Sequence, residues 1–539
     1  MRITNNMIMK NTKVNINSNK VGVDTLNTQM TTQKKIDRPS DDPVIAIRAL
    51  RLRSSLSQIN QYYERNIPDA ESWLEVTETA LTNMRKVLTD IHTQCVNGAN
   101  DTLTAEDRNI ILNQLQSLAE QVYSEGNADY AGRTVFTGYK TNTTLTFPSR
   151  EADTKYEINE YLPADAVQEH KYSYGGLSTP TYTELTDAIT NNETPDDPGM
   201  ATVKRVRLAY DNLSELNSGA FSYSKEAADG SNVMTTVYFK GDNAGNRVTV
   251  TTSPDGTTTT TGTVNSGFTY REMTTEQLET MKYAVGEDDI IYNKDTGELL
   301  LGDNVAKEIN SNSARIDVNY NKTGFSKGDL KPENYFDCKN ITDEDNPIEY
   351  KNYDEDHVFM PQEINYTVAI NQTLTVNTVA NNVFSSTIGR DVEELVTAVK
   401  AAITANDTVS DIKNMMKQEQ YSSDEMQAKL KEYLAAAERQ ADYADDYMQK
   451  LYSKGITSFS NYMEKVNNAI TEVGNRGDRL AVIKSRMSNQ QLTVKDLKST
   501  NEDKELSDIV IDYTAAYTAY QASLQAAAKL QKQTLLDYL

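Results

Sequence analysis

The sequence predicts an α+β protein of several domains, in which both ends of the chain form an α-helical coiled-coil core and a β-rich outer domain is inserted between them. Three observations predict this architecture. The chain has 539 residues, more than one hydrophobic core usually organises. Apolar residues recur at helical three- and four-residue steps in residues 1–140 and 391–539. Residues 141–390 are instead rich in Thr, Tyr, Asn and Gly and contain alternating segments typical of strands.

The first 40 residues carry two thin apolar rows. Met7, Val14 and Val21 recur every seven positions, and a second row contains Met9 and Ile16. At 100° per residue the two rows lie on nearly opposite sides of a helix. Such a helix buries too little apolar surface to be stable alone, so we expect it to form an assembly segment that neighbours cover on both sides. A flexible tail, or a short strand at residues 14–17, is the alternative interpretation.

Residues 38–43 (Arg-Pro-Ser-Asp-Asp-Pro) mark the start of a long helix. Asp42 is a candidate N-cap, and Pro43 suits the first helical position because its missing N–H costs nothing there. Arg38 could pair with Asp41 or Asp42, and this pairing would stiffen the turn that Pro39 helps to form.

The first long helix is predicted to carry a narrow apolar seam that includes Leu52 and Leu56. Pro68 is expected to kink or restart the helix, and the seam then continues through Trp73. Residues 97–98 (Asn-Gly) predict its end, and a further helix follows before Gly126.

The C-terminal segment repeats this pattern up to the last residues. Alanines lie between its apolar positions and are small enough to let a partner helix approach closely. An apolar seam at an extreme terminus is unusual, because most domains fray there. The candidate packing residues of this segment are Leu506, Tyr513, Tyr520, Leu524 and Leu535.

The middle of the chain predicts three β-hairpins and one helix. The hairpins are expected at residues 233–252, 290–301 and 364–376, and the helix over residues 203–216. Because this region interrupts a helical framework, we expect the two ends of the chain to pair across it. The predicted domains are therefore 1–140, 141–390 and 391–539.

Composition excludes several function classes. The net charge of −24 argues against nucleic acid or an anionic membrane surface as a partner. No apolar run approaches the ~20 residues that would cross a bilayer, so no membrane insertion is expected. The N-terminus does not resemble a general secretory signal peptide, which by itself suggests the cytoplasm. Two distant cysteines, Cys95 and Cys338, form neither a disulfide framework nor a cysteine zinc site.

No motif predicts catalysis, a cofactor or a metal site. His92, His170 and His357 are scattered, and no H-E-x-x-H, Walker or G-x-S-x-G pattern occurs. The acidic residues 343–345 and 354–356 fit no EF-hand and are interpreted as solvated loops. Residues 257–261, all threonine, suit either O-linked sugars or a turn with an exposed strand edge.

Several motifs together resemble a known family, the flagellar hook–filament junction proteins called hook-associated protein 3, within the flagellin superfamily. The resemblance covers roughly residues 1–140 and 440–539. Gln33 departs from it, because the family commonly has a Thr-Gly step before the paired lysines. Residues 40–43 (Ser-Asp-Asp-Pro) also differ from the DDAAG-like string of flagellin. The motifs that carry the resemblance are residues 38–43, 73–81, 132–138, 473–476 and the closing Leu-Leu-Asp-Tyr-Leu of residues 535–539.

The resemblance implies a flagellin-like core and an extracellular, non-enzymatic role in the bacterial flagellum. Its partners would be copies of itself in a ring, flagellin and the other hook–filament junction protein. Export would use the flagellar type III apparatus, with an export chaperone and with residues 1–40 disordered in the monomer. A flagellin that forms the filament itself is the nearest alternative. A surface adhesin that uses the β-rich insert is an alternative from a different class.

Overall fold

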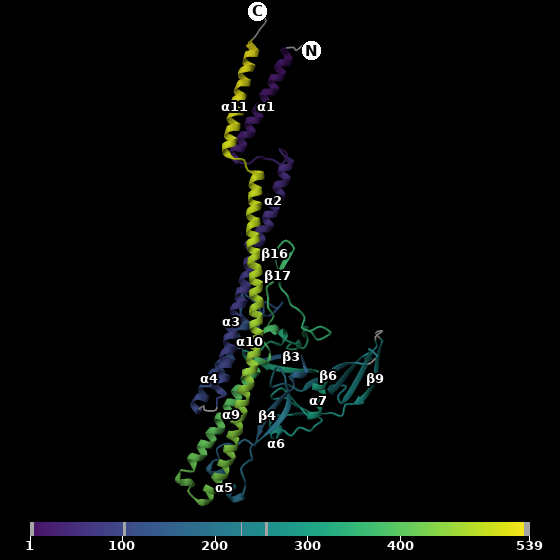
Figure 1. Cartoon of the computed structure of the whole chain (residues 1–539), viewed down its shortest axis with the longest axis vertical. Coiled ribbons are helices and arrows are strands. Elements are labelled where there is room, and N and C mark those ends of the chain that lie inside the picture. Colours follow the sequence, from purple (N-terminus) through teal and green to yellow (C-terminus); the bar gives the residue numbers. More distant parts are fainter. Residues whose placement is uncertain (1–4, 101–103, 228, 254–256, 533–539) are drawn as a thin grey trace, which may run out of the picture. The chain divides into compact units, whose positions relative to one another are not determined.

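Helices lie at both ends of the chain and strands lie between them (Figure 1). The structure is a computed structural model that describes residues 5–100, 104–227, 229–253 and 257–532. The α-helices are α1 (Asn5–Thr32), α2 (Pro43–Gln61), α3 (Ile67–Gly98), α4 (Ala105–Gln121), α5 (Tyr182–Asn191), α6 (Thr275–Thr280), α7 (Asp303–Ser311), α8 (Ala380–Val383), α9 (Thr387–Met415), α10 (Asp424–Glu502) and α11 (Leu506–Lys532). Short helical turns are η1 (Tyr62–Asn66), η2 (Ser124–Asn127), η3 (Ala164–Ala166), η4 (Pro332–Asn334) and η5 (Glu419–Tyr421).

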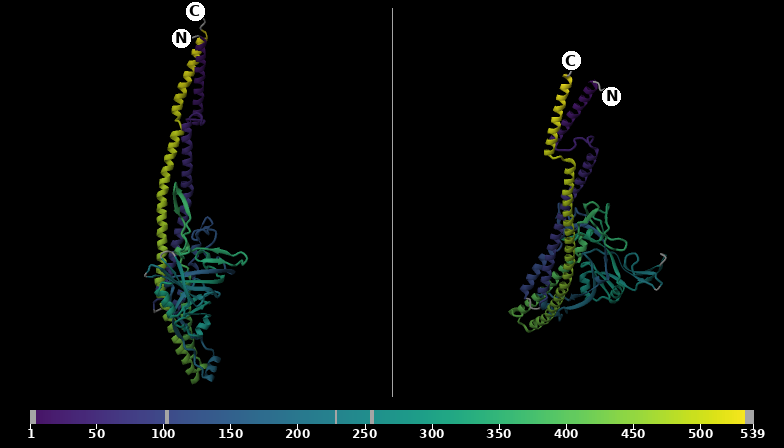
Figure 2. Two further views of the ribbon diagram at one scale, coloured as in Figure 1. Left: turned by 90° about the vertical axis from the view of Figure 1, so that its right-hand side faces the viewer. Right: turned by 45° about the horizontal axis from the view of Figure 1, so that its top comes forward.

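The chain divides into two compact units. The first unit contains residues 5–72, 365–375 and 476–532, so it joins both ends of the chain. In this unit α1 and α11 lie side by side and run in opposite directions, as Figure 1 and both views of Figure 2 show. The two ends of the chain therefore pair with each other, as the sequence predicts.

A π-helical turn precedes the proline in the first long helix. In η1 the amide of Ile67 bonds back to the carbonyl of Tyr62, five residues earlier. Pro68 has no N–H to donate and its ring crowds the carbonyl four residues before it. The wider turn accommodates this crowding, so the helix continues through Pro68 instead of ending there.

The second unit, residues 73–364 and 376–475, holds the two large sheets. One has five strands in the order β10-β11-β12-β5-β4, and the other has eight in the order β15-β14-β3-β13-β6-β7-β8-β9. The strands are β1 (Asp129–Tyr130), β2 (Arg133–Thr134), β3 (Glu151–Leu162), β4 (Gln168–Tyr174), β5 (Gly199–Arg207), β6 (Leu216–Glu226), β7 (Asn232–Lys240), β8 (Asn246–Thr252), β9 (Thr258–Asn265), β10 (Thr269–Met273), β11 (Asp289–Asn293), β12 (Glu298–Leu301), β13 (Arg315–Phe325), β14 (Asp337–Asn340), β15 (Ile348–Tyr350), β16 (Asn365–Ala369) and β17 (Gln372–Thr375).

The three predicted hairpins are confirmed. β7 pairs with β8, β11 with β12, and β16 with β17, each antiparallel. The β16–β17 hairpin belongs to the first unit. The helix predicted over residues 203–216 is wrong, because β5 occupies Gly199–Arg207 and β6 begins at Leu216. Its three- and four-residue apolar spacing is overridden by pairing with β4 and β12, which buries alternate positions such as Val203 and Arg205.

The second unit has a helical subcluster beside its sheets. The tip of the α9–α10 hairpin packs around Leu185 of α5 with Ile412, Tyr421 and Leu430. In the described parts of the chain, no helix combines the length and the hydrophobicity needed to cross a membrane.

Candidate assembly surface

The α1–α11 pair uses only one of the two apolar rows of α1. Ile16 and Val23 of the second row are half-buried beside α11, although Met9 of that row is 47% exposed. Met7, Val14 and Val21 of the first row are 53%, 60% and 59% exposed. Asn19 Nδ2 donates a hydrogen bond to Ser523 Oγ at 3.3 Å across the pair. The outer row of α1 therefore remains uncovered in the single chain.

α11 is divided in the same way. Tyr513 and Tyr520 are half-buried, whereas Leu506 and Leu524 are 47% and 42% exposed. The outer side of this helix also carries a groove of about 710 Å³, built largely from small side chains. Its lining residues are Val510, Ile511, Thr514, Ala515, Thr518, Ala519 and Ala522.

The breaks in the two chain ends lie together. Lys35 N donates to Glu502 O at 2.8 Å, and Lys504 N donates to Gln33 O at 3.1 Å. Gln33 has a φ of 54°, a left-handed conformation that strains a residue with a Cβ atom. A glycine, which has no Cβ atom, would adopt this conformation without strain, but this sequence has Gln33 at the position.

Glu502 anchors the end of α10 to α2. Arg53 Nε and Nη2 donate to its two carboxylate oxygens at 2.8 and 2.7 Å, and Lys34 Nζ lies 3.7 Å away. The hydrogen bonds from Arg53 lower the pKa of Glu502, and the same contact raises the pKa of Arg53. Lys34 also pairs with Asp503 and, with Ser499, lowers the pKa of that carboxyl group.

The turn before α2 is built by two aspartates. Asp42 Oδ1 accepts the amides of Val44 and Ile45 at 2.9 and 3.1 Å, so the predicted N-cap with Pro43 in the first turn is confirmed. Asp41 Oδ2 accepts the amide of Arg38 at 2.8 Å. The predicted partners of the Arg38 side chain are wrong, because its ion pair is with Asp37 at 3.8 Å. Asp41 and Asp42 instead accept hydrogen bonds from backbone N–H groups. These charge-assisted bonds stabilise the carboxylates more than an ion pair with an exposed arginine would. Pro39 is exposed in this turn.

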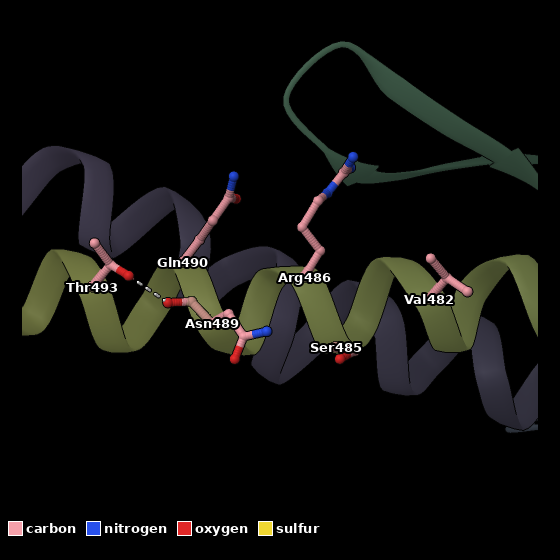
Figure 3. A pocket seen from close by; sticks show the side chains of 6 residues that line it. All are labelled: Val482, Ser485, Arg486, Asn489, Gln490 and Thr493. Atoms are coloured by element: carbon pink, nitrogen blue, oxygen red, sulfur yellow. Dashed lines mark hydrogen bonds between the residues drawn. The ribbon is translucent and has the colours of Figure 1, made fainter.

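Polar grooves lie on the remaining helices of the first unit. Leu52 is half-buried on α2, and Leu56 lines a groove of about 420 Å³ with Arg53 and Lys498. A second groove, of about 430 Å³, follows α10 (Figure 3). There Arg486 points toward the β16–β17 hairpin and bonds to Gln372. Val482, which lines the same groove, is 71% exposed.

Two predicted residues lie elsewhere. Trp73 belongs to the second unit, where it is 1% exposed and Arg133 lies 5.0 Å over its ring. Leu535 lies outside the described residues. The residues that sequence reasoning missed are Glu502, Arg53, Lys34 and the strained Gln33. The sequence gives a clue only to Gln33, where the resembling family commonly has a glycine. The other three could not be predicted, because their partners are more than 400 positions away in the chain.

These surfaces consist of exposed apolar, small and polar side chains on helices. Among the described residues, no three His, Cys, Asp or Glu side chains gather in a cluster able to hold a metal ion. The acidic loops use their carboxylates internally: Asp343 Oδ1 accepts the amide of Asp345, and Asp354 Oδ1 accepts that of Asp356.

Paired helical ends with an uncovered apolar side define a class of assembly protein, and part of this chain is similar to flagellins. Residues 3–141 match the bacterial flagellin N-terminal helical region. The chain thus has a flagellin-like fold, with helical ends and a β-rich insert, as the sequence predicts.

The more particular resemblance is to flagellar hook-associated protein 3, and it is confirmed. The chain is 27% identical over 235 residues to that protein of Salmonella typhimurium, covering 43% of this chain and 69% of the relative. It is 30% identical over 177 residues to the same protein of Escherichia coli, covering 32% of this chain and 53% of the relative. The crystal structure of FlgL from Xanthomonas campestris aligns over 84% of this chain and 99% of its own at 11% identity, with a TM-score of 0.28.

Proposed function

We propose that this protein is a structural component of the bacterial flagellum at the junction of hook and filament. There it links the hook-side junction protein to flagellin and acts without enzymatic chemistry. The observation that carries the proposal is the α1–α11 pair, because it joins the two ends of the chain and leaves an apolar row on each helix uncovered. The similarity to hook-associated protein 3 supports the junction over the filament itself.

Copies of the chain would associate head to tail in a ring. The outer row of α1 has one side chain every seven residues, or about 10.5 Å of helix. The alanine-lined groove of α11 offers small residues at a similar periodicity. We infer that the outer row of one copy packs into the groove of its neighbour. This contact joins two different surfaces, so it can close a ring or continue into a filament of related subunits.

The composition of α1 suits export through a narrow channel by the flagellar type III apparatus, with a chaperone. The helix contains many asparagines and threonines, which have low intrinsic helix propensity. Hydroxyls such as those of Thr12 and Thr25 turn back to carbonyls four residues earlier. The segment therefore depends on its neighbours for order, and we expect it to be disordered in the exported monomer.

Localisation on isolated flagella tests the proposal. Immunogold labelling is expected at the distal end of the hook. Labelling along the whole filament would instead show a flagellin. Labelling of cell surfaces without flagella would show an adhesin that uses the β-rich unit.

Deletion of residues 501–539 separates export from assembly. The truncated chain is expected to appear in the culture medium but not on the hook. Incorporation at the wild-type level would contradict the role of the terminal helices.

A further inference from the structure

A cleft at one end of the eight-stranded sheet has no part in the assembly surface. It has a volume of about 540 Å³, within the usual range for small-molecule sites. Its wall is formed where β3 ends, where β13 begins and where the loop after β15 folds back. The lining residues used below are Tyr161, Asp165, Ser313, Arg315, Tyr353 and His357.

Aromatic rings form a corner in this cleft. The rings of Tyr161 and His357 are 4.3 Å apart at 87°, and Tyr353 lies 5.4 Å from Tyr161. The Arg315 guanidinium lies 5.9 Å over the Tyr161 ring. Two perpendicular rings offer both a flat apolar surface and a wall beside it, which suits a ligand with one apolar face.

The groups of this corner are held in position before any ligand binds. Tyr161 donates its hydroxyl to Asp337 at 3.2 Å. Arg315 makes two bonds to Asp317, at 2.6 and 2.9 Å. Preorganised side chains lose little entropy on binding, which is typical of a recognition site.

The loop that supplies His357 is a tight hydrogen-bonded turn. His357 has a φ of 61°, which is uncommon for a residue with a side chain. Its Nδ1 atom is buried and has no hydrogen-bond partner within the described chain. Next to it, Val358 is 60% exposed. The turn accounts for this conformation, because His357 N donates to Asp354 O at 3.0 Å and Val358 N donates to Asp354 Oδ1 at 2.8 Å, so the backbone of His357 is held in place.

A row of amide side chains continues from the cleft along the same face of the sheet. Ile158 and Glu160 of β3 point inward and are buried, so Asn159 lies with Tyr161 on the other face. Asn319 of β13 lies opposite Asn159 and donates to it at 2.7 Å. Asn217 extends the row, donating to Asn319 Oδ1 at 2.6 Å.

We propose that this face binds a neutral saccharide, with one sugar ring in the aromatic corner and the next above the amide row. A pyranose presents an apolar C–H face and a rim of hydroxyl groups, which match the Tyr161–His357 corner and the planar polar groups around it. Asp165 and Ser313 are exposed at the rim and can bond to hydroxyls. Anionic ligands fit poorly, because Asp317 already neutralises Arg315 and the chain carries a net charge of −24.

The test uses the full-length chain and three neutral trisaccharides: cellotriose, chitotriose and β-1,4-galactotriose. Saturation-transfer NMR and calorimetry are expected to show saturable binding of at least one of them, with a Kd in the millimolar range. No saturable binding of any trisaccharide up to 10 mM would overturn the proposal.

Variants locate the binding. His357→Asn keeps a residue that tolerates a left-handed conformation and is expected to weaken binding at least fivefold. Tyr161→Leu keeps an apolar strand residue and is expected to abolish measurable binding. His92→Asn on α3 is the matched control and is expected to change nothing. Unchanged binding in both cleft variants, with unchanged melting temperatures, would place the sugar elsewhere and overturn the proposal.

A hexaproline peptide tests whether the cleft binds a proline-rich peptide instead of a saccharide. Polyproline helices also dock on aromatic side chains. Hexaproline is expected not to displace the trisaccharide. Displacement of the trisaccharide from the wild-type chain, together with direct hexaproline binding that is lost in Tyr161→Leu, would show a peptide groove and overturn the saccharide assignment.

Discussion

Glu160 is a carboxyl group buried within the eight-stranded sheet. Its Oε2 atom accepts hydrogen bonds from Ala209 N at 3.1 Å and from Tyr320 Oη at 2.8 Å. Burial outweighs these bonds and raises the pKa of Glu160 to about 7. The folded state therefore prefers the protonated carboxyl group.

Glu160→Gln is expected to make the protein more stable than the wild type at alkaline pH, where Glu160 is ionised. A raised carboxyl pKa contributes stability that is complete below the unfolded pKa of about 4.5 and is lost as the pH rises through 7. The glutamine keeps both acceptor bonds without a charge. Urea denaturation is expected to show similar midpoints at pH 5 and a higher midpoint for the variant at pH 8. The exposed Glu169→Gln is the control, and an equal gain there would contradict the assignment.

Gln33→Gly is expected to stabilise the α1–α11 pair by about 0.5–1 kcal/mol. Glycine removes the left-handed strain of Gln33, and this gain exceeds the entropy that glycine adds to the unfolded chain. Amide hydrogen exchange in α11 measures the change. Gln521→Gly within α11 is the matched control and is expected to cost about 1 kcal/mol, because its backbone is helical. Faster exchange in Gln33→Gly would refute the strain.

At the scale of the element, α1 differs on its two sides: one apolar row faces α11, and the other is exposed. Ile16 and Val23 of its inner row are half-buried beside α11, and its outer row stays exposed. Burying a whole aliphatic side chain contributes about 1.5–3 kcal/mol, and these half-exposed residues can gain part of that in an assembly.

Val14→Glu and Leu524→Glu are expected to reduce incorporation into flagella at least tenfold while export continues. Each places a charge on an apolar row that a neighbour would cover, and an unpaired buried charge is costly. Quantitative immunoblots of flagella and medium measure the two steps. Asn15→Glu and Asn17→Glu are the controls, since these exposed positions of α1 lie outside its two rows. An equal loss of incorporation in the controls would show that the added negative charge, and not its place on an apolar row, prevents assembly.

At the scale of the whole molecule, the second unit is held together by a buried ionic network between sheet and helices. Arg207 Nη1 donates to Glu394 Oε2 of α9 at 2.8 Å, and Arg205 also pairs with Glu394. His170 Nδ1 lies 3.2 Å from Glu394 Oε1. The other groups around His170 are Tyr172 on β4, Glu298 on β12, Asp391 on α9, and Tyr447 and Lys454 on α10. Burial and then Arg205 lower the pKa of His170 to about 3, so its imidazole is neutral at pH 7.

Acid is expected to weaken this network through His170. A lowered histidine pKa contributes stability that is complete above the unfolded value of 6.5 and is lost as the pH falls toward 3. Burial alone would raise the pKa of Glu394, but Arg205 and Arg207 hold it at about 2, so this carboxylate stays charged over the same range. His170→Gln is expected to flatten the fall of the urea midpoint between pH 6.5 and 4. His92→Gln is the control, and an unchanged slope in His170→Gln would contradict this account.

Local patterns in the sequence determined much of the fold. The helical ends, the three hairpins and the Asp42 cap follow from periodicity and turn residues, whose causes lie within a few positions of each other. The two apolar rows of α1 were also readable, because helical geometry alone separates them. The helix predicted over residues 203–216 shows the limit, since β4 and β12 impose a strand there.

Tertiary structure decided which surfaces are covered and which charges meet. Only the pairing with α11 selects the inner row of α1 and leaves Met7, Val14 and Val21 exposed. The Arg53–Glu502 contact and the strained Gln33 depend on segments more than 400 residues apart. Periodicity records which side of a helix is apolar, but the partner on that side is chosen by packing over the whole chain.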